Sequence, residues 1–235
     1  VNVNKTSGTF TATTNPLKVG TLNLLSASQT IFSQNVQIGT LTTTENSGNI
    51  TFAKGGAIST ATEILSSDDV TFGTEGEDST FIFGAEDALV DFTHTEGKTF
   101  IYGTIKAANI TLADCQINKN IVTGNFVAED CTFNGELNAN NVTVTNLNSS
   151  TGSVNINLSG DFTNNGGTVK INKLTLLDSS TLTGDLTIGE FIATQSSMTN
   201  PDEAKTLTIT NNLIVDSMKI SGQKDENKIT IANSG

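Results

Sequence analysis

The two cysteines of the chain stand sixteen residues apart, at equivalent positions of an internal repeat. Residues 109–118 (NITLADCQIN) recur as residues 125–134 (NFVAEDCTFN), with the first and last Asn, the Asp and the Cys unchanged. If the copies stack as neighbouring parallel strands, the Cα atoms of Cys115 and Cys131 lie about 4.8 Å apart, within the range of about 4.4–6.8 Å found in disulfides. A disulfide, which a secreted location would allow, and a pair of small buried core residues are both open. Neither a CxxC spacing nor a nearby histidine supports a metal site at these cysteines.

Acidic residues are densest between positions 63 and 96, where ten of them occur without a lysine. Clustered oxygens suit a hard cation, so Glu75, Glu77 and Asp78 could contribute to a Ca²⁺ site. Their spacing matches neither an EF-hand loop nor a calcium-binding nonapeptide repeat. We therefore interpret Glu75, Glu77, Asp78, Glu86 and Asp87 as an acidic patch on the surface, and we expect neither a metal nor another cofactor.

Catalytic machinery is hard to assemble from the remaining residues. His94 is the only histidine, arginine is absent and no GxSxG motif occurs, so we expect His94 at the surface and not in a triad. Asp68, Asp69 and Asp91 could supply the convergent carboxylates of a polysaccharide hydrolase. The Trp and Arg side chains that usually grip sugars are missing, and Tyr occurs once. We therefore expect no enzyme, with a polysaccharide-degrading β-helix enzyme as the alternative.

Short strands arranged in coils are the elements that must position these residues. In each copy of the repeat, apolar and polar residues alternate along two short edges, with an Asp at the corner between them. Ile110 would then stack on Phe126, and Ile117 on Phe133, in successive coils. A period this short fits one coil of a solenoid better than a whole domain. The repeat therefore predicts an all-β fold, a parallel β-helix.

The same alternation continues along almost the whole chain, between Gly, Asn, Asp and Ser residues that accept turns. Examples are residues 36–38, 50–52, 70–72, 142–144, 154–158 and 186–188. No segment shows the apolar stripe of a helix, and residues 194–205 are the best candidate for a protruding loop. Two tandem antiparallel sandwiches are the rival arrangement, against which the register of the repeat and the scarcity of Asn-Gly turns argue. No linker divides the chain, so we expect one β-helical segment over residues 1–235.

The composition excludes several classes of function. Hydrophobic residues make up 35% of the chain and charged residues 15%, while Thr, Ser, Asn and Gly are abundant. The many β-branched residues distinguish this composition from that of a disordered chain. All twelve basic residues are lysines, and a net charge of −12 opposes binding to nucleic acid and to anionic lipid. No apolar run approaches the roughly 20 residues that cross a bilayer as a helix.

Several phrases of the sequence resemble secreted bacterial β-helices. Residues 160–169 (GDFTNNGGTV) and 182–188 (LTGDLTI) are similar to autotransporter passenger domains and to two-partner-secreted adhesins of the filamentous-haemagglutinin kind. Residues 32–35 (FSQN) and 55–58 (GGAI) resemble the FxxN and GGAI motifs of chlamydial polymorphic membrane proteins. Those proteins repeat both motifs many times, whereas GGAI occurs once here, and the two cysteines depart from the usual Cys-poor passenger.

The resemblance implies a right-handed parallel β-helix on the extracellular surface of a Gram-negative bacterium. Residues 1–235 would be a segment of a longer secreted protein, anchored to the outer membrane through another part. The expected function is that of an adhesin or structural stalk with a role in virulence. Its expected partner is a host-cell surface protein or glycan, or a neighbouring cell. Self-association is a further expectation. A self-associating matrix or pore-forming toxin fragment is the remaining alternative.

Overall fold

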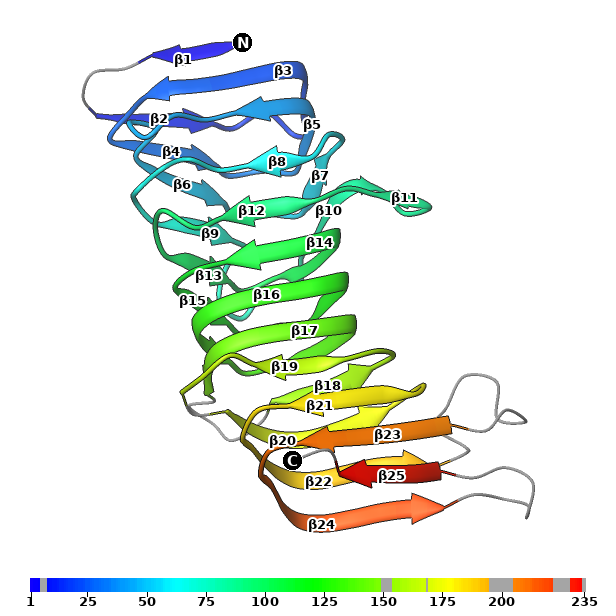
Figure 1. Cartoon of the computed structure of the whole chain (residues 1–235). Coiled ribbons are helices and arrows are strands. Elements are labelled where there is room, and N and C mark those ends of the chain that lie inside the picture. Colours follow the sequence, from blue (N-terminus) through cyan, green and yellow to red (C-terminus); the bar gives the residue numbers. More distant parts are fainter. Residues whose placement is uncertain (5–7, 149–153, 168, 195–204, 222–228, 234–235) are drawn as a thin grey trace. The chain divides into compact units, whose positions relative to one another are not determined.

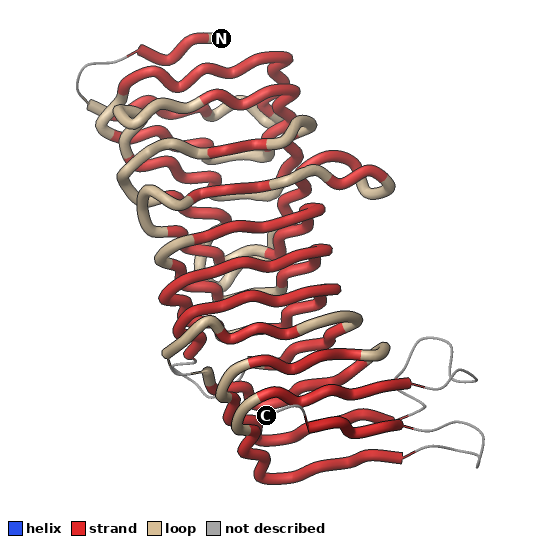
Figure 2. Tube along the Cα trace, in the orientation of Figure 1, coloured by secondary structure: helices blue, strands red, loops and turns tan. Residues whose placement is uncertain are grey.

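The computed structural model describes residues 1–4, 8–148, 154–167, 169–194, 205–221 and 229–233. They belong to two compact units, unit 1 (Val1–Thr123) and unit 2 (Gly124–Gly235). Every regular element in the described part of the chain is a β-strand, and none of these residues is helical (Figures 1 and 2).

Unit 1 winds through three parallel sheets, one for each edge of its coils. Its strands are β1 (Asn2–Asn4), β2 (Thr9–Ala12), β3 (Leu17–Ser26), β4 (Gln29–Phe32), β5 (Val36–Thr42), β6 (Asn49–Phe52), β7 (Gly56–Ile58), β8 (Thr62–Glu63), β9 (Val70–Phe72), β10 (Thr80–Ala85), β11 (Ala88–Leu89), β12 (Phe92–His94), β13 (Thr99–Ile101), β14 (Thr104–Leu112) and β15 (Cys115–Ile117). Strands β2, β4, β6, β9, β13 and β15 pair in this order as the first sheet. The starts of β3 and β5, then β7, β10 and the start of β14, form the second. The third holds β1 with the ends of β3 and β5, and β8 and β12 with the end of β14.

A ladder of phenylalanines fills the interior of unit 1. Phe32, Phe52 and Phe72 follow one another at intervals of twenty residues and pair in register on β4, β6 and β9. Their rings stack at 4.8 and 5.1 Å between centroids, and all three are fully buried. Phe83 and Phe92 stack at 4.4 Å and meet Phe72 edge-on. One coil of this part therefore takes about twenty residues, and the sixteen-residue interval appears where Thr99 pairs with Cys115.

Unit 2 has the same three-edged arrangement in its described residues. Strand β16 (Ile121–Phe133) crosses the boundary in the sequence, and β17 (Glu136–Asn148), β18 (Asn155–Leu158), β19 (Phe162–Asn164), β20 (Lys170–Leu176), β21 (Ser180–Thr183), β22 (Leu186–Thr194), β23 (Lys205–Thr210), β24 (Leu213–Ser221) and β25 (Ile229–Asn233) follow. One edge runs β17–β18–β20–β22–β24 and another β17–β19–β21–β23–β25. The third pairs the starts of β20, β22 and β24.

The inward positions expected for both copies of the repeat are buried. In the first copy the exposed fraction is at most 1% for Ile110, Leu112, Cys115 and Ile117. In the second copy it is at most 2% for Phe126, Ala128, Cys131 and Phe133. Among the described residues of each unit the strands pair in parallel, apart from the short antiparallel pair β10–β11. This parallel pairing excludes the antiparallel sandwiches. The predicted all-β parallel β-helix is confirmed. The extent of one continuous segment over residues 1–235 stays a prediction, and of the loop expected at 194–205, residues 195–204 lie outside the described residues.

Side-chain amides join neighbouring coils along the outside of both units. Asn23 donates to Asn2 Oδ1 at 2.7 Å, and Asn141 donates to Asn125 Oδ1 at 2.8 Å. In unit 2, Asn157 donates to Asn138 Oδ1 at 2.8 Å. An amide both donates and accepts, so a column of Asn at one register position satisfies itself from coil to coil. Asn at equivalent positions of neighbouring coils thus links these coils to each other.

A hairpin leaves the coil between β10 and β12. Gly84 pairs with Leu89 and Ala85 with Ala88 in antiparallel fashion, and Figure 1 shows β11 projecting away from the sheets. Gly84 has a φ of 97°, a left-handed conformation that glycine adopts without steric cost. The chain then returns to register, because Phe92 pairs with both Thr62 and Ile110.

Candidate functional site

The residues of the predicted acidic patch are exposed but lie in two places. Glu75, Glu77 and Asp78 belong to the loop between β9 and β10, whereas Glu86 and Asp87 form the tip of the β10–β11 hairpin. Lysines from other coils reach three of them: Lys54 forms an ion pair with Glu77, Lys119 with Asp78 at 2.7 Å, and Lys106 with Glu86 at 2.9 Å. The hydrogen bond from Lys119 lowers the pKa of Asp78. Among the described residues, no group of three or more His, Cys, Asp or Glu could hold a metal ion.

Both cysteines belong to the buried core. Cys115 lies in β15 of unit 1 and Cys131 in the part of β16 that belongs to unit 2, with 1% and 2% of their surfaces exposed. In the described part of the chain neither cysteine is a free thiol. The pairing of the two with each other stays a prediction.

His94 is buried, so the prediction of a surface histidine is wrong. Its exposed fraction is 0%, with Nδ1 2.8 Å from the Thr99 hydroxyl and Nε2 3.0 Å from the Ser66 carbonyl oxygen. A carbonyl only accepts, so Nε2 carries the proton and Nδ1 accepts from Thr99. Burial lowers the pKa of His94, against the opposing effects of its bond to Ser66 and of the charges of Asp69 and Glu96. Both ring nitrogens are engaged, and the neutral imidazole is part of the core.

The carboxylates of the predicted hydrolase site are not brought together. Asp68 and Asp69 precede β9, at the start of an edge in the first sheet. Asp91 precedes β12, at the start of an edge in the third sheet. The length of the third edge therefore separates Asp91 from Asp68 and Asp69. Asp91 instead shares a shallow depression of about 400 Å³ with Glu63. One of its oxygens accepts a hydrogen bond of 2.7 Å from Asn109.

A groove crosses the second sheet of unit 1, and we call it the β7 groove. Strand β7 lies between β5 and β10, with Gln37 paired to Ala57 and Ala57 to Ile82. On its outward face β7 carries the methyl group of Ala57 between Gln37 and Ile82, so this coil is lower than its two neighbours. Gly56 is in register with the buried Val36 and Phe81 and belongs to the inner face. The flanking coils lie about 9.6 Å apart, twice the spacing of about 4.8 Å between strands. The resulting depression has a volume of about 520 Å³.

Close backbone packing requires the two glycines of the groove. A Cβ at Gly55 would lie 2.5 Å from the carbonyl oxygen of Thr80, and one at Gly56 would lie 2.3 Å from that of Val36. Both distances are shorter than any real Cβ contact, so larger residues would push the coils apart. The GGAI segment is therefore first a packing feature of the stack, and the groove is its consequence on the outside.

The walls and one end of the β7 groove carry polar groups. Asn35 and Gln37 form one wall and are exposed, while Thr80 and Ile82 form the other. Lys54 and Asp78 lie at the end where β7 begins. Sequence reasoning missed this site, because it depends on which residues of different coils lie side by side.

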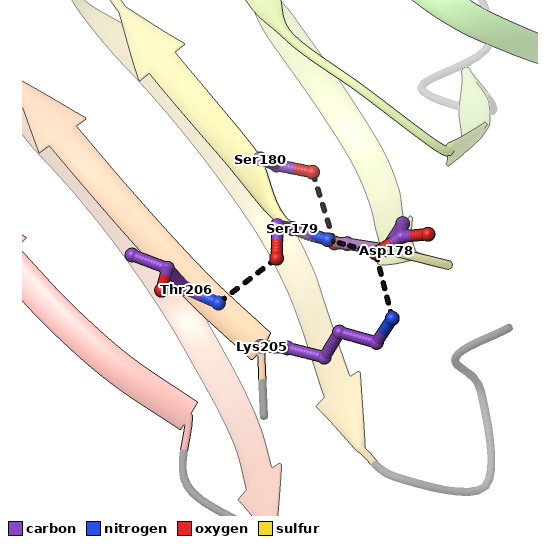
Figure 3. A network of polar contacts seen from close by, with 5 residues as sticks. All are labelled: Asp178, Ser179, Ser180, Lys205 and Thr206. Atoms are coloured by element: carbon purple, nitrogen blue, oxygen red, sulfur yellow. Dashed lines mark hydrogen bonds and ion pairs between the residues drawn. The ribbon is translucent and has the colours of Figure 1, made fainter. Parts of the chain in front are cut away.

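A buried lysine in unit 2 was also missed. Lys205, at the start of β23, is 6% exposed, and its Nζ lies 2.9 Å from an Asp178 carboxylate oxygen (Figure 3). The same oxygen accepts from the Ser179 N–H at 2.7 Å, and the Thr206 N–H donates to the Ser179 hydroxyl at 3.1 Å. The bond from Lys205, followed by that from Ser179, lowers the pKa of Asp178. The two charges neutralise each other, so the network fastens one coil to the next.

The described part of the chain contains no helix of the length and apolar character needed to cross a membrane. In comparisons with known proteins, no family model, no curated protein and no solved structure matched the chain.

Proposed function

We propose that the chain is a surface-exposed β-helical segment of a secreted bacterial protein that acts as an adhesin or structural stalk. The observation that carries this proposal is the in-register interior of each unit, of which the stacked rings of Phe32, Phe52 and Phe72 are the clearest part. Each coil is stabilised by its neighbours, so stability accumulates along the stack and does not depend on one large core. Such a scaffold resists local opening and presents polar faces and loops to a partner.

The described side chains support binding more than turnover. His94 has both nitrogens engaged in the core, and Asp91 is separated from Asp68 and Asp69 by an edge of the coil. The outward side chains are mainly Thr, Asn and Ser, which suit hydrogen bonding to a glycan or protein surface. We extend the proposal to an extracellular location, with anchoring to an outer membrane through another part of the parent protein, and to a host or neighbouring cell as the partner.

Labelling of intact source cells tests the location. An antibody raised against the purified chain should stain cells without permeabilisation, and protease added outside should remove the signal. The fluorescent chain should also bind to cultured host cells or to the source cells in a saturable manner. Staining that appears only after permeabilisation would refute the surface assignment, and a lack of saturable binding would leave the stalk in place of the adhesin.

One observation favours a second candidate, a polysaccharide hydrolase. Glu63 and Asp91 line the same shallow depression, and hydrolases of this kind need two carboxylates. A screen of polysaccharides with the unmodified chain and with Glu63→Gln and Asp91→Asn decides between the candidates. Cleavage that both substitutions abolish would replace the adhesin proposal, whereas Asp68→Asn should have no effect in either case.

A further inference from the structure

We propose that the β7 groove binds a neutral oligosaccharide laid parallel to the strands. The proposal rests on the proposed function as an adhesin, to which it adds a site and a class of ligand. The groove is open to the outside and lies entirely in unit 1.

The shape of the groove suits a narrow, extended ligand. Its floor is the backbone of β7, a strand of three residues, which at about 3.3 Å per residue is about 10 Å long. The width is set by the neighbouring coils, about 9.6 Å apart between backbones. Its volume of about 520 Å³ lies within the range of about 300–1,000 Å³ of small-molecule sites.

The chemistry of the walls matches sugar hydroxyls. The exposed amides of Asn35 and Gln37 each offer donors and an acceptor, and no described residue engages either side chain. Across the groove the Thr80 hydroxyl adds one more such group, and the half-exposed Ile82 offers an aliphatic surface for the C–H face of a sugar ring. The groove thus combines these hydrogen-bonding groups with a lining that is mostly apolar.

The charges around the groove select a neutral ligand. Lys54 is paired with Glu77 and Asp78 with Lys119, so both charges at the end of the groove are compensated. The chain as a whole carries a net charge of −12, which repels uronic-acid and sulfated glycans.

The backbone of the groove argues against an extended peptide as the occupant. Peptides that bind to sheets usually add a strand at an unpaired edge and gain main-chain hydrogen bonds. Strand β7 already pairs with β5 on one side and with β10 on the other. A peptide above it would find no free ladder, whereas a sugar uses the side chains of the walls.

Binding of neutral trisaccharides to the full chain tests the proposal. We would titrate maltotriose, cellotriose and chitotriose, and the anionic trigalacturonate, by calorimetry and by chemical-shift perturbation. Ala57→Gln fills the groove with the side chain that Gln37 already carries one coil earlier, so the fold should be kept. Thr51→Gln adds the same side chain to the same coil on the neighbouring sheet, and is the matched control.

We expect at least one neutral trisaccharide to bind, with affinity reduced at least tenfold by Ala57→Gln and unchanged by Thr51→Gln. Double replacement Asn35→Ala/Gln37→Ala should weaken binding to a similar degree. A lack of binding by every neutral probe, equal binding by Ala57→Gln, or tighter binding of trigalacturonate would overturn the proposal. Cell binding that survives Ala57→Gln would refute the groove as the binding site and support the adhesin function. Trisaccharide binding without cell binding would support the groove as a binding site and refute the adhesin function.

Discussion

Phe52 lies at the centre of the phenylalanine ladder, so its removal tests whether each coil is stabilised by its neighbours. The ring is fully buried, stacks on Phe32 at 4.8 Å and on Phe72 at 5.1 Å, and meets Phe81 edge-on at 6.3 Å. Truncation of a buried Phe to Ala costs about 3–5 kcal/mol, and an aromatic pair contributes about 0.5–1.5 kcal/mol beyond burial. Because Phe52 has two stacked partners, we expect Phe52→Ala to lower the free energy of unfolding by about 5 kcal/mol.

Urea denaturation measures this cost, and hydrogen exchange locates it. Nearest-neighbour stacking predicts that amide protection falls first in β4, β6 and β9, which carry the ladder. Phe100→Ala is the control, because Phe100 points outward on β13, is half-buried and contacts the Lys98 ammonium group at 5.5 Å from the ring centre. That contact is worth about 0.5–1 kcal/mol, so the control should cost about 1 kcal/mol. Equal costs for the two substitutions, or a loss of protection spread evenly over unit 1, would refute the reasoning.

Three further predictions concern charge and oxidation. The folded-state pKa of His94 is lowered, so its contribution to stability should be complete above about pH 6.5. Below that pH the contribution should decline towards the folded pKa, by at most about 1.4 kcal/mol per pH unit. The urea midpoint of unfolding should therefore depend less on pH in His94→Gln than in the unmodified chain across that window. Asp178→Ala removes the carboxylate that pairs with the buried ammonium group of Lys205, and should lower the free energy of unfolding by about 1–3 kcal/mol. This is below the usual cost of about 3–5 kcal/mol because the Asp178 side chain is 37% exposed. Lys205→Met should change it by at most about 1 kcal/mol, and equal losses for the two variants in urea unfolding would contradict this. Peptide mapping without reductant should recover Cys115 linked to Cys131, and separate, alkylatable peptides would disprove the bond. Reduction of the bond should lower the free energy of unfolding by about 3 kcal/mol, as for a loop of about 15 residues.

The path of the buried residues could be read from the sequence, because it depends on alternation alone. Ile110, Leu112 and Ile117 were expected to face inward and do so, and the lack of helix among the residues that the structure describes follows from the same pattern. The twenty-residue coil was present as well, in the interval from Phe32 to Phe52 and on to Phe72. It was missed because the sixteen-residue repeat, with its identical residues, is the stronger signal.

The prediction for His94 failed because it weighed chemistry and ignored position. Phe92 and His94 alternate with Thr93, which places the histidine on the same inward face as the phenylalanine. Burial was then possible because a corner carbonyl, that of Ser66, and the Thr99 hydroxyl satisfy the ring. These partners lie 28 and 5 residues away in the sequence, and only the coil geometry brings both to the ring.

Features that depend on neighbouring coils could not be predicted. The acidic stretch contains no lysine, yet Lys54, Lys106 and Lys119 reach it from other coils. The β7 groove depends on the small outward residue Ala57 between Gln37 and Ile82, and a short side chain becomes a depression only when larger residues are known to flank it. The register between neighbouring coils is set by the folded structure, and a weakly repeated sequence does not reveal it.

The β10–β11 hairpin shows how such a chain can acquire new sequence at little cost. The strand leaves the stack after Phe83 and rejoins it at Phe92, and these two rings lie against each other at 4.4 Å, so the interior is continuous across the excursion. Extra residues placed between Glu86 and Asp87 would lengthen only the exposed tip. Corners of this kind are where related genes can diversify by insertion, and where a foreign epitope could be displayed without redesign of the layers beneath.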